Sequence, residues 1–147
     1  MKPMLAGVAL ALFVSPAMAQ QSAGSDAGQA LPSGFKAEPL LKTAQTADGD
    51  PLKFPQTEKA EIVSVIGTIE AGGRTARHQH PVPVFVYVME GALEVQTEGG
   101  EPRIYNAGDA FMESVGRWHQ GFNKGDGAAK ILVVFMGEEG KPTTVTE

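Results

Sequence analysis

The 147-residue chain contains no cysteine, and this absence limits its chemistry before any motif is considered. Without thiols the protein has no disulfide and no thiolate metal ligand, so a metal site would have to use nitrogen and oxygen donors. The chain also lacks a basic patch or a block of like charge, and 12 Lys and Arg against 17 Asp and Glu give a net charge of −5. This charge pattern argues against nucleic-acid binding.

Long hydrophobic runs are scarce as well, and the one near the start is too short to span a bilayer. It extends from Leu5 to Val14 behind a positively charged start, and Ala17-Met18-Ala19 matches an A-x-A cleavage pattern. Residues 1–19 are therefore interpreted as a secretory signal peptide, with an uncleaved anchor as the weaker alternative. No cysteine follows, which excludes a lipoprotein anchor. The mature protein is expected to be periplasmic or secreted, without membrane association after cleavage.

The length predicts one domain, and composition divides the remaining chain. Residues 20–34 are rich in Gln, Ser, Ala, Gly and Asp, which predicts a flexible lead-in. Residues 35–60 carry separate apolar side chains between polar ones, which indicates an N-terminal arm or an extra edge strand. The compact domain is expected over residues 61–147.

Residues 61–147 have the pattern of β-structure throughout, because short valine-rich runs alternate with glycine turns and no convincing amphipathic helix is present. The expected strands cover residues 61–71, 84–89, 92–97, 110–113, 117–122 and 130–136. The turn Glu90-Gly91 is typical of a hairpin between the second and third of these strands. The last strand is apolar on both faces, as expected inside a sandwich or barrel. The sequence therefore predicts an all-β barrel or sandwich.

The chain has three histidines, and their arrangement indicates a metal site. His78 and His80 form an H-x-H pair, and His119 lies 39 residues beyond it. Side chains of a strand alternate between two faces, so both imidazoles of the pair should share a face with a row of valines. That row consists of Val82, Val84, Val86 and Val88. Ring nitrogens on an apolar face need partners, which a metal ion or, alternatively, ordinary hydrogen bonds to structural histidines would supply.

Two motifs around these histidines resemble the cupin superfamily, in particular its small single-domain Cupin_2-type members. Gly72-x5-His78-x-His80 followed by Gly91 is similar to the first cupin motif. Gly108-x5-Ser114-x-Gly116-x2-His119-x3-Asn123 is similar to the second, with Ser114 where the family usually has proline. The resemblance implies an all-β double-stranded β-helix, the cupin jelly-roll barrel, over residues 61–147. It also implies a metal held inside the barrel by histidines on opposing strands.

The chain departs from this family at one ligand. The first cupin motif places a glutamate three or four residues after its second histidine, where this chain has Val84 and Phe85. Three neutral imidazoles can still hold a divalent transition metal (Fe, Mn, Ni, Cu or Zn), with open positions for water or substrate. Loss of the carboxylate leaves the site more positive, which favours an anionic small-molecule ligand.

Glu113 is the candidate replacement for the missing carboxylate. The family pattern implies that positions 111 and 113 face inward, where an unpaired charge would be costly. The hypothesis is that Glu113 is a fourth metal ligand or the acid/base residue beside the metal, and thus the candidate catalytic residue. The alternatives are an exposed residue at a strand end, or a carboxylate paired with one of three arginines: Arg74, Arg77 or Arg117.

The leading functional hypothesis is a metal-dependent small-molecule enzyme with dioxygenase-like chemistry, because three ligands with open positions suit non-haem iron. The alternative is a periplasmic cupin that binds or senses a small ligand without turnover, and a cupin with a vestigial site is a third possibility. Phe85, Tyr87 and Trp118 have outward parity, which indicates that one sheet face is covered. A homodimer is therefore expected.

Overall fold

The structure of the chain is a computed structural model, and it describes residues 34–147. The predicted signal peptide and nearly all of the predicted lead-in lie outside these residues. Residues 37–147 form one unit by their contacts. No helix long and apolar enough to cross a membrane occurs in the described part of the chain.

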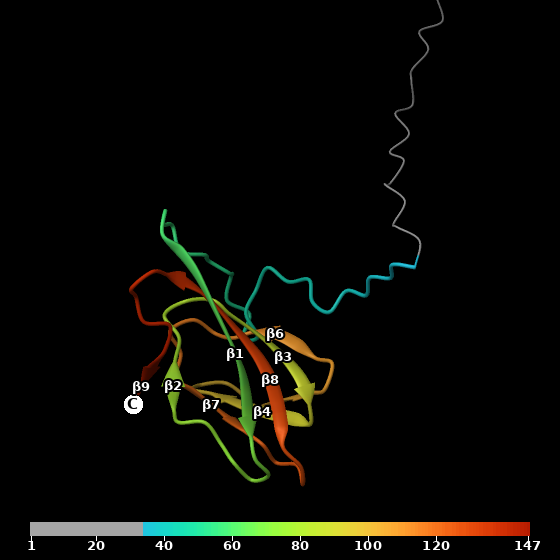
Figure 1. The fold of residues 1–147 in the computed structure, drawn as a ribbon. Coiled ribbons are helices and arrows are strands. Elements are labelled where there is room, and N and C mark those ends of the chain that lie inside the picture. The colour runs from blue at the N-terminus through green and yellow to red at the C-terminus, as the bar shows by residue number, and fades with distance from the viewer. Residues whose placement is uncertain (1–33) are drawn as a thin grey trace, which may run out of the picture. The chain divides into compact units, whose positions relative to one another are not determined.

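Strands β1 to β9 of the described chain form two sheets that face each other (Figure 1). One sheet has the order β1-β8-β3-β6 and the other the order β5-β4-β7-β2-β9, and all strand pairs are antiparallel. The strands are β1 Ala60–Ile69, β2 His78–Gln79, β3 Val84–Glu90, β4 Ala92–Thr97, β5 Arg103–Asn106, β6 Ala110–Met112, β7 His119–Phe122, β8 Ala129–Glu138 and β9 Val145–Thr146. The predicted all-β double-stranded β-helix is confirmed.

The core lies between the two sheets and follows the period-two pattern of the strands. On β3, Val84, Val86 and Val88 are buried, whereas Phe85 and Tyr87 between them are half-buried. Both sheets contribute further to the same apolar cluster: Ile69, Val82, Leu93, Val95, Phe111, Ile131 and Val133. Removing these side chains from water is the main force that holds the sheets together.

The hairpin predicted at Glu90-Gly91 is wrong, because β3 and β4 belong to different sheets. The chain crosses between the sheets at Gly91, where φ is 73° and glycine is favoured. A Cβ at Gly91 would also lie 2.9 Å from the carbonyl oxygen of Ala128. The sequence correctly predicted a turn at Gly91, but a turn alone does not determine which strand pairs with β4.

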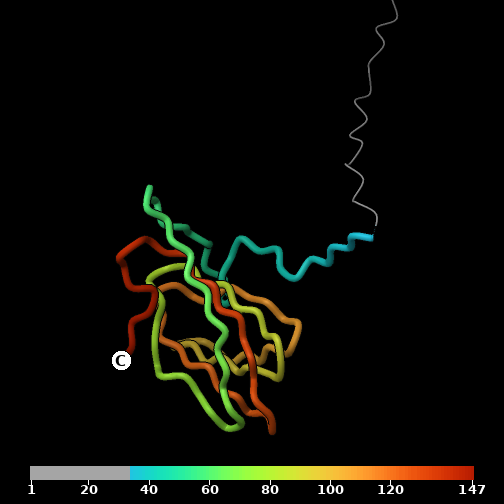
Figure 2. Tube along the Cα trace, in the orientation of Figure 1, coloured from blue at the N-terminus to red at the C-terminus, as the bar shows by residue number. Residues whose placement is uncertain are grey.

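The segment before β1 runs as an arm, and one isolated bridge between Gln45 and Pro51 takes the place of a strand there. Figure 2 follows this arm in blue-green towards β1. Thr46 is buried, and the Ala47 N–H donates a hydrogen bond of 2.8 Å to the carbonyl oxygen of Met112 at the end of β6. The arm therefore contacts the barrel beside the strand that precedes Glu113.

Candidate metal centre

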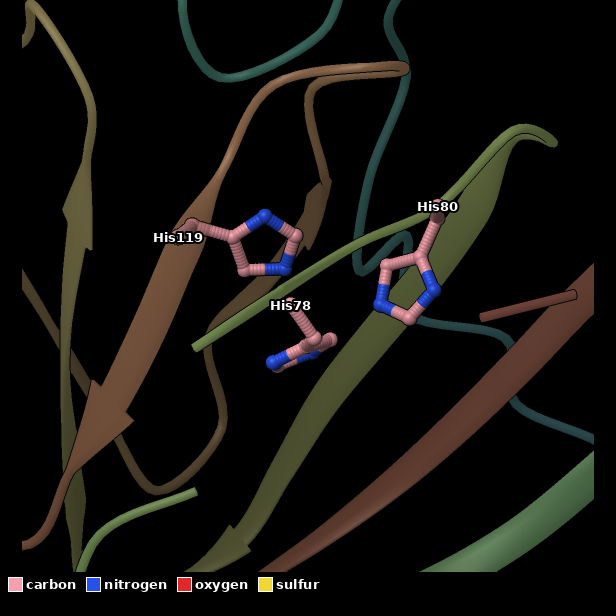
Figure 3. Close-up of side chains that lie close together, drawn as sticks. All are labelled: His78, His80 and His119. Carbon is pink, nitrogen blue, oxygen red and sulfur yellow. The ribbon is translucent and has the colours of Figure 1, made fainter. Parts of the chain in front are cut away.

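Pairing of β2 with β7 brings the three histidines together. His78 is the register partner of His119, and residues paired across antiparallel strands project to the same face. His80 follows two residues after His78 and shares its face. Figure 3 shows the three rings converging on one space, with centroids 4.4, 4.8 and 5.2 Å apart. One ligand atom from each ring lies within 4.8 Å of the other two.

Each imidazole is held at Nδ1 by a backbone carbonyl group. The contacts are His78 to Ala76 at 2.8 Å, His80 to Thr143 at 2.8 Å and His119 to Arg117 at 2.9 Å. A carbonyl oxygen can only accept a hydrogen bond, so Nδ1 carries the proton in every ring. In the neutral imidazole this leaves a lone pair on Nε2, which is the arrangement that metal-binding histidines usually show.

Glu113 follows β6 directly and turns its carboxylate towards the same space. Its side chain is 11% exposed, and Oε2 lies 3.1 Å from Nε2 of His80 and 3.6 Å from Nε2 of His119. Neither alternative for Glu113, an exposed residue at a strand end or a carboxylate paired with an arginine, fits this position. The side chain is not exposed, and no ion pair joins it to an arginine among the described residues.

The arrangement of Glu113 and the histidines is unfavourable unless a proton or a cation lies among them. If His80 is neutral and Glu113 is ionised, a lone pair on Nε2 of His80 faces a lone pair on Oε2 of Glu113 at 3.1 Å, and the two repel each other. Glu113 Oε2 and His119 Nε2 are also buried without a hydrogen-bond partner in the described part of the chain, which is costly. Two ligands about 2.1 Å from one metal ion at a right angle would be roughly 3.0 Å apart. Three imidazoles and one carboxylate therefore fit a divalent transition metal.

The proximity of these groups shifts their pKa values. Burial raises the pKa of the Glu113 carboxyl, but the adjacent His119 and His80 rings outweigh burial and lower this pKa to about 2. Burial lowers the pKa of His119, but the Glu113 carboxylate outweighs burial, so the pKa of this imidazole is raised. For His78, burial is the largest influence, and together with repulsion from the other two rings it lowers the pKa. An ionised Glu113 and a neutral His78 are the forms that bind metal.

The three histidines and Glu113 line a cavity of about 560 Å³ between the two sheets. Much of the remaining wall is apolar: Ile69, Leu93, Val95, Ile131, Val133 and Phe135. A cavity of this size suits a small molecule, which would lie beside the four polar side chains.

A polar cluster next to Glu113 was not predicted from the sequence. Ser114 Oγ donates a hydrogen bond to Asp48 of the arm, and Arg103 Nη1 lies 2.6 Å from the same carboxylate. Burial raises the pKa of Asp48, but the bonds from Ser114 and Arg103 outweigh burial, so the pKa is lowered. The one sequence signal was Ser114 itself, a hydroxyl where the family usually has proline.

A second contact of the arm supports the loop before His119. Asp50 forms an ion pair of 2.9 Å with Arg117, whose carbonyl oxygen accepts the Nδ1 proton of His119. Asp48 and Asp50 of the arm thus both contact the loop that joins Glu113 to His119.

Comparisons with known proteins agree with this geometry. The Cupin_2 family, described as a cupin domain, matches residues 65–135. The DMSP lyase DddQ from Ruegeria pomeroyi DSS-3 is similar in structure, with a TM-score of 0.51 and 25% identity over 58% of this chain and 42% of that chain. Bacillus subtilis oxalate decarboxylase, a protein with Mn(II) centres, gives a TM-score of 0.51 and 26% identity over 58% of this chain and 23% of that chain.

The chain spans less than half the length of either of these structures. No curated protein matches its sequence. The family match, the two facing sheets and the histidine cluster nevertheless lead to the same assignment. The chain belongs to the cupin superfamily, and its three-histidine cluster is that of a metal-binding cupin.

Proposed function

We propose that this cupin is a metal-dependent enzyme that acts on a small molecule, with dioxygenase-like chemistry. One observation carries the proposal: backbone carbonyls hold Nδ1 of all three histidines, so that three Nε2 atoms and the Glu113 carboxylate converge at one cavity. Similarity to a lyase and to a decarboxylase with Mn(II) centres supports a catalytic role for such a site.

In this proposal His78, His80 and His119 hold a divalent ion (Fe, Mn, Ni, Cu or Zn) through Nε2. The bound ion would supply Lewis acidity or redox chemistry to the substrate. Glu113 is the fourth ligand or the acid/base residue, because its carboxylate lies 3.1 Å from a ligand atom of His80 and so within reach of a molecule bound there. The apolar wall would exclude bulk water from the reacting groups. The positive charge of the bound divalent ion would favour an anionic ligand.

The metal content of protein purified without an affinity tag tests this proposal, beside the variant His80→Ala. We expect near-stoichiometric transition metal in the wild type and its loss in the variant. If both proteins lack metal and fold equally well, the proposal is contradicted and the site is vestigial.

Turnover is tested separately, by dioxygen consumption and product analysis during a screen of small organic acids. We expect both signals with the metal-loaded protein and neither with His80→Ala. An acid that binds tightly without product would instead identify a binding or sensing cupin.

We also propose that the mature protein is periplasmic or secreted and begins at Gln20, because residues 1–19 have the pattern of a signal peptide. Mass spectrometry of the protein from a periplasmic fraction tests this cleavage. A full-length chain that stays in the cytoplasm would contradict it.

A further inference from the structure

We infer that the cavity takes a compact monoanion with an apolar body, such as a short-chain monocarboxylate, in preference to a dicarboxylate. This inference rests on the proposed function and deepens it, since it names the class of molecule that the same cavity would bind. Its basis is the distribution of polar and apolar side chains around the cavity wall.

Apart from the histidines and Glu113, most polar side chains of the cavity wall are either in hydrogen-bonding contact with other protein groups or exposed to solvent. Thr75 Oγ1 accepts a hydrogen bond of 3.0 Å from the N–H of Gly121. The Thr144 hydroxyl lies 3.2 Å from Nδ1 of His80. Glu70 is exposed and has the wrong charge for an anion. A bound anion would therefore find its favourable partners at the metal centre.

Arg74 is the one Arg or Lys among the described residues that line the cavity, and it is exposed. It forms an antiparallel bridge with Phe122, and bridged residues project to the same face. On β7, His119 and Gly121 are buried and face inward, so Phe122 and therefore Arg74 project away from the interior. Arg74 therefore lies at the exposed rim of the cavity, and a second carboxylate deeper between the sheets would have no cationic side chain beside it, which is costly.

The apolar wall provides the favourable environment for a hydrocarbon body. Leu93 and Val95 come from one sheet, and Ile131, Val133 and Phe135 come from the other. An alkyl chain between these side chains leaves water, and the gain in affinity is proportional to the apolar area removed from water.

Gly67 creates room for such a chain. Its register partner is Ile131, which places it on the inward face of β1. A Cβ at Gly67 would lie 3.3 Å from Cγ1 of Ile131, so a side chain there would compete for the same space. Gly67 does not have a positive φ, so the backbone does not require glycine at this position. The missing side chain therefore leaves space beside Ile131 that a hydrocarbon body can occupy.

Binding of two acid series to the protein loaded with Co(II) tests this inference. Co(II) uptake and its visible spectrum are measured first, because they report on the metal site alone. Titration calorimetry with monocarboxylates from acetate to hexanoate is expected to show that the dissociation constant falls about fourfold for each added methylene. Dicarboxylates of five and six carbons, which are too long to chelate the ion readily through both carboxylates, are expected to bind at least about tenfold more weakly than monocarboxylates of the same carbon number.

The outcomes separate this inference from the proposed function. Normal Co(II) uptake with equal affinity for all acids, or with tighter binding of the dicarboxylates, overturns the inference and leaves the metal site intact. Absence of Co(II) uptake overturns both.

Gly67→Val provides a second test, because it occupies part of the cavity beside Ile131 without changing a metal ligand. We expect hexanoate binding to weaken by about tenfold while Co(II) uptake and acetate binding remain unchanged. Gly67→Ala replaces this variant if valine prevents folding, and a smaller loss in the same direction is then expected. Ser64→Val is the matched control, because Ser64 is exposed on the opposite face of β1. Unchanged hexanoate binding in a folded Gly67 variant overturns the inference.

Discussion

His78 and His119 face each other as register partners of β2 and β7, and their ring centroids are 4.4 Å apart, closer than any other pair in the cluster. Strand register therefore creates the metal centre. A slip of β2 by one residue would turn His78 to the other side of the sheet. Since the ligands meet only in the folded chain, metal binding and folding are coupled.

This coupling predicts that a divalent transition metal raises the melting temperature of the protein. At a free metal concentration of about 100 times the dissociation constant, binding stabilises the folded state by about 2.7 kcal/mol. For a domain of this size the melting temperature should rise on the order of 10 °C. Calorimetry measures the rise, which a chelator should reverse and His119→Ala should largely abolish. A rise of the same size in His119→Ala would show that the metal binds elsewhere.

Glu113→Gln removes a charge and keeps the shape of the side chain. We expect metal affinity to fall on the order of 10–100-fold, because the carboxylate lies close to two ring nitrogens at the centre. Competition with a chelator of known affinity gives the dissociation constants. Glu101→Gln is the control, since Glu101 is an exposed carboxylate in the turn between β4 and β5. Equal affinity in the wild type and both variants would exclude Glu113 as a ligand.

Asp48 predicts a dependence of stability on pH. The side chain is 7% exposed, and its pKa is lowered below the ordinary value of 3.8. A carboxylate with a lowered pKa stabilises the fold above its ordinary pKa, and this contribution is lost as the pH falls through the lowered value. Asp48→Asn should therefore reduce the free energy of unfolding by about 1–3 kcal/mol at neutral pH, and by less at about pH 3.

Urea denaturation at both pH values measures the effect of Asp48→Asn. Asp126→Asn is the control, because Asp126 is exposed in the loop before β8 and should change little. A loss of stability that is equally large at both pH values would show that the charge of Asp48 does not matter.

Features that depend on local periodicity could be predicted from the sequence. The alternation of β3 correctly placed Val84, Val86 and Val88 inside and Phe85 between them towards the outside. The same argument placed His78 and His80 on one face. Such predictions succeed because the period of a strand is a property of the backbone alone.

Features that depend on distant segments could not be predicted in this way. The supposed hairpin at Gly91 is a crossing between sheets, because packing of the whole barrel determines the partners of β3 and β4. The bond from Ser114 to Asp48 spans 66 residues, and the bond that holds His80 to Thr143 spans 63. No local pattern in the chain reports such contacts, so the supports of the metal centre became visible only in the folded structure.

The outer face of the β1-β8-β3-β6 sheet carries exposed apolar side chains. β1 is an edge strand, and Ile62 and Ile66 on its outer face are 65% and 55% exposed. Their register partners on β8 are Met136 and Leu132, which extend the apolar surface. Exposed edges and apolar patches of this kind are usually covered in soluble proteins.

This surface predicts a homodimer, with the β1 edge and outer face of one copy against those of a second copy. Size-exclusion chromatography with light scattering should give twice the mass of the mature chain. The double substitution of Ile62→Lys and Ile66→Lys places two cations at each side of the interface, and should give a folded monomer because burying unpaired charges is costly. Ile104→Lys is the matched control, since Ile104 is 64% exposed on β5 of the other sheet and its variant should remain a dimer. A monomeric wild type would contradict the prediction, and dissociation by Ile104→Lys alone would move the interface to the other sheet.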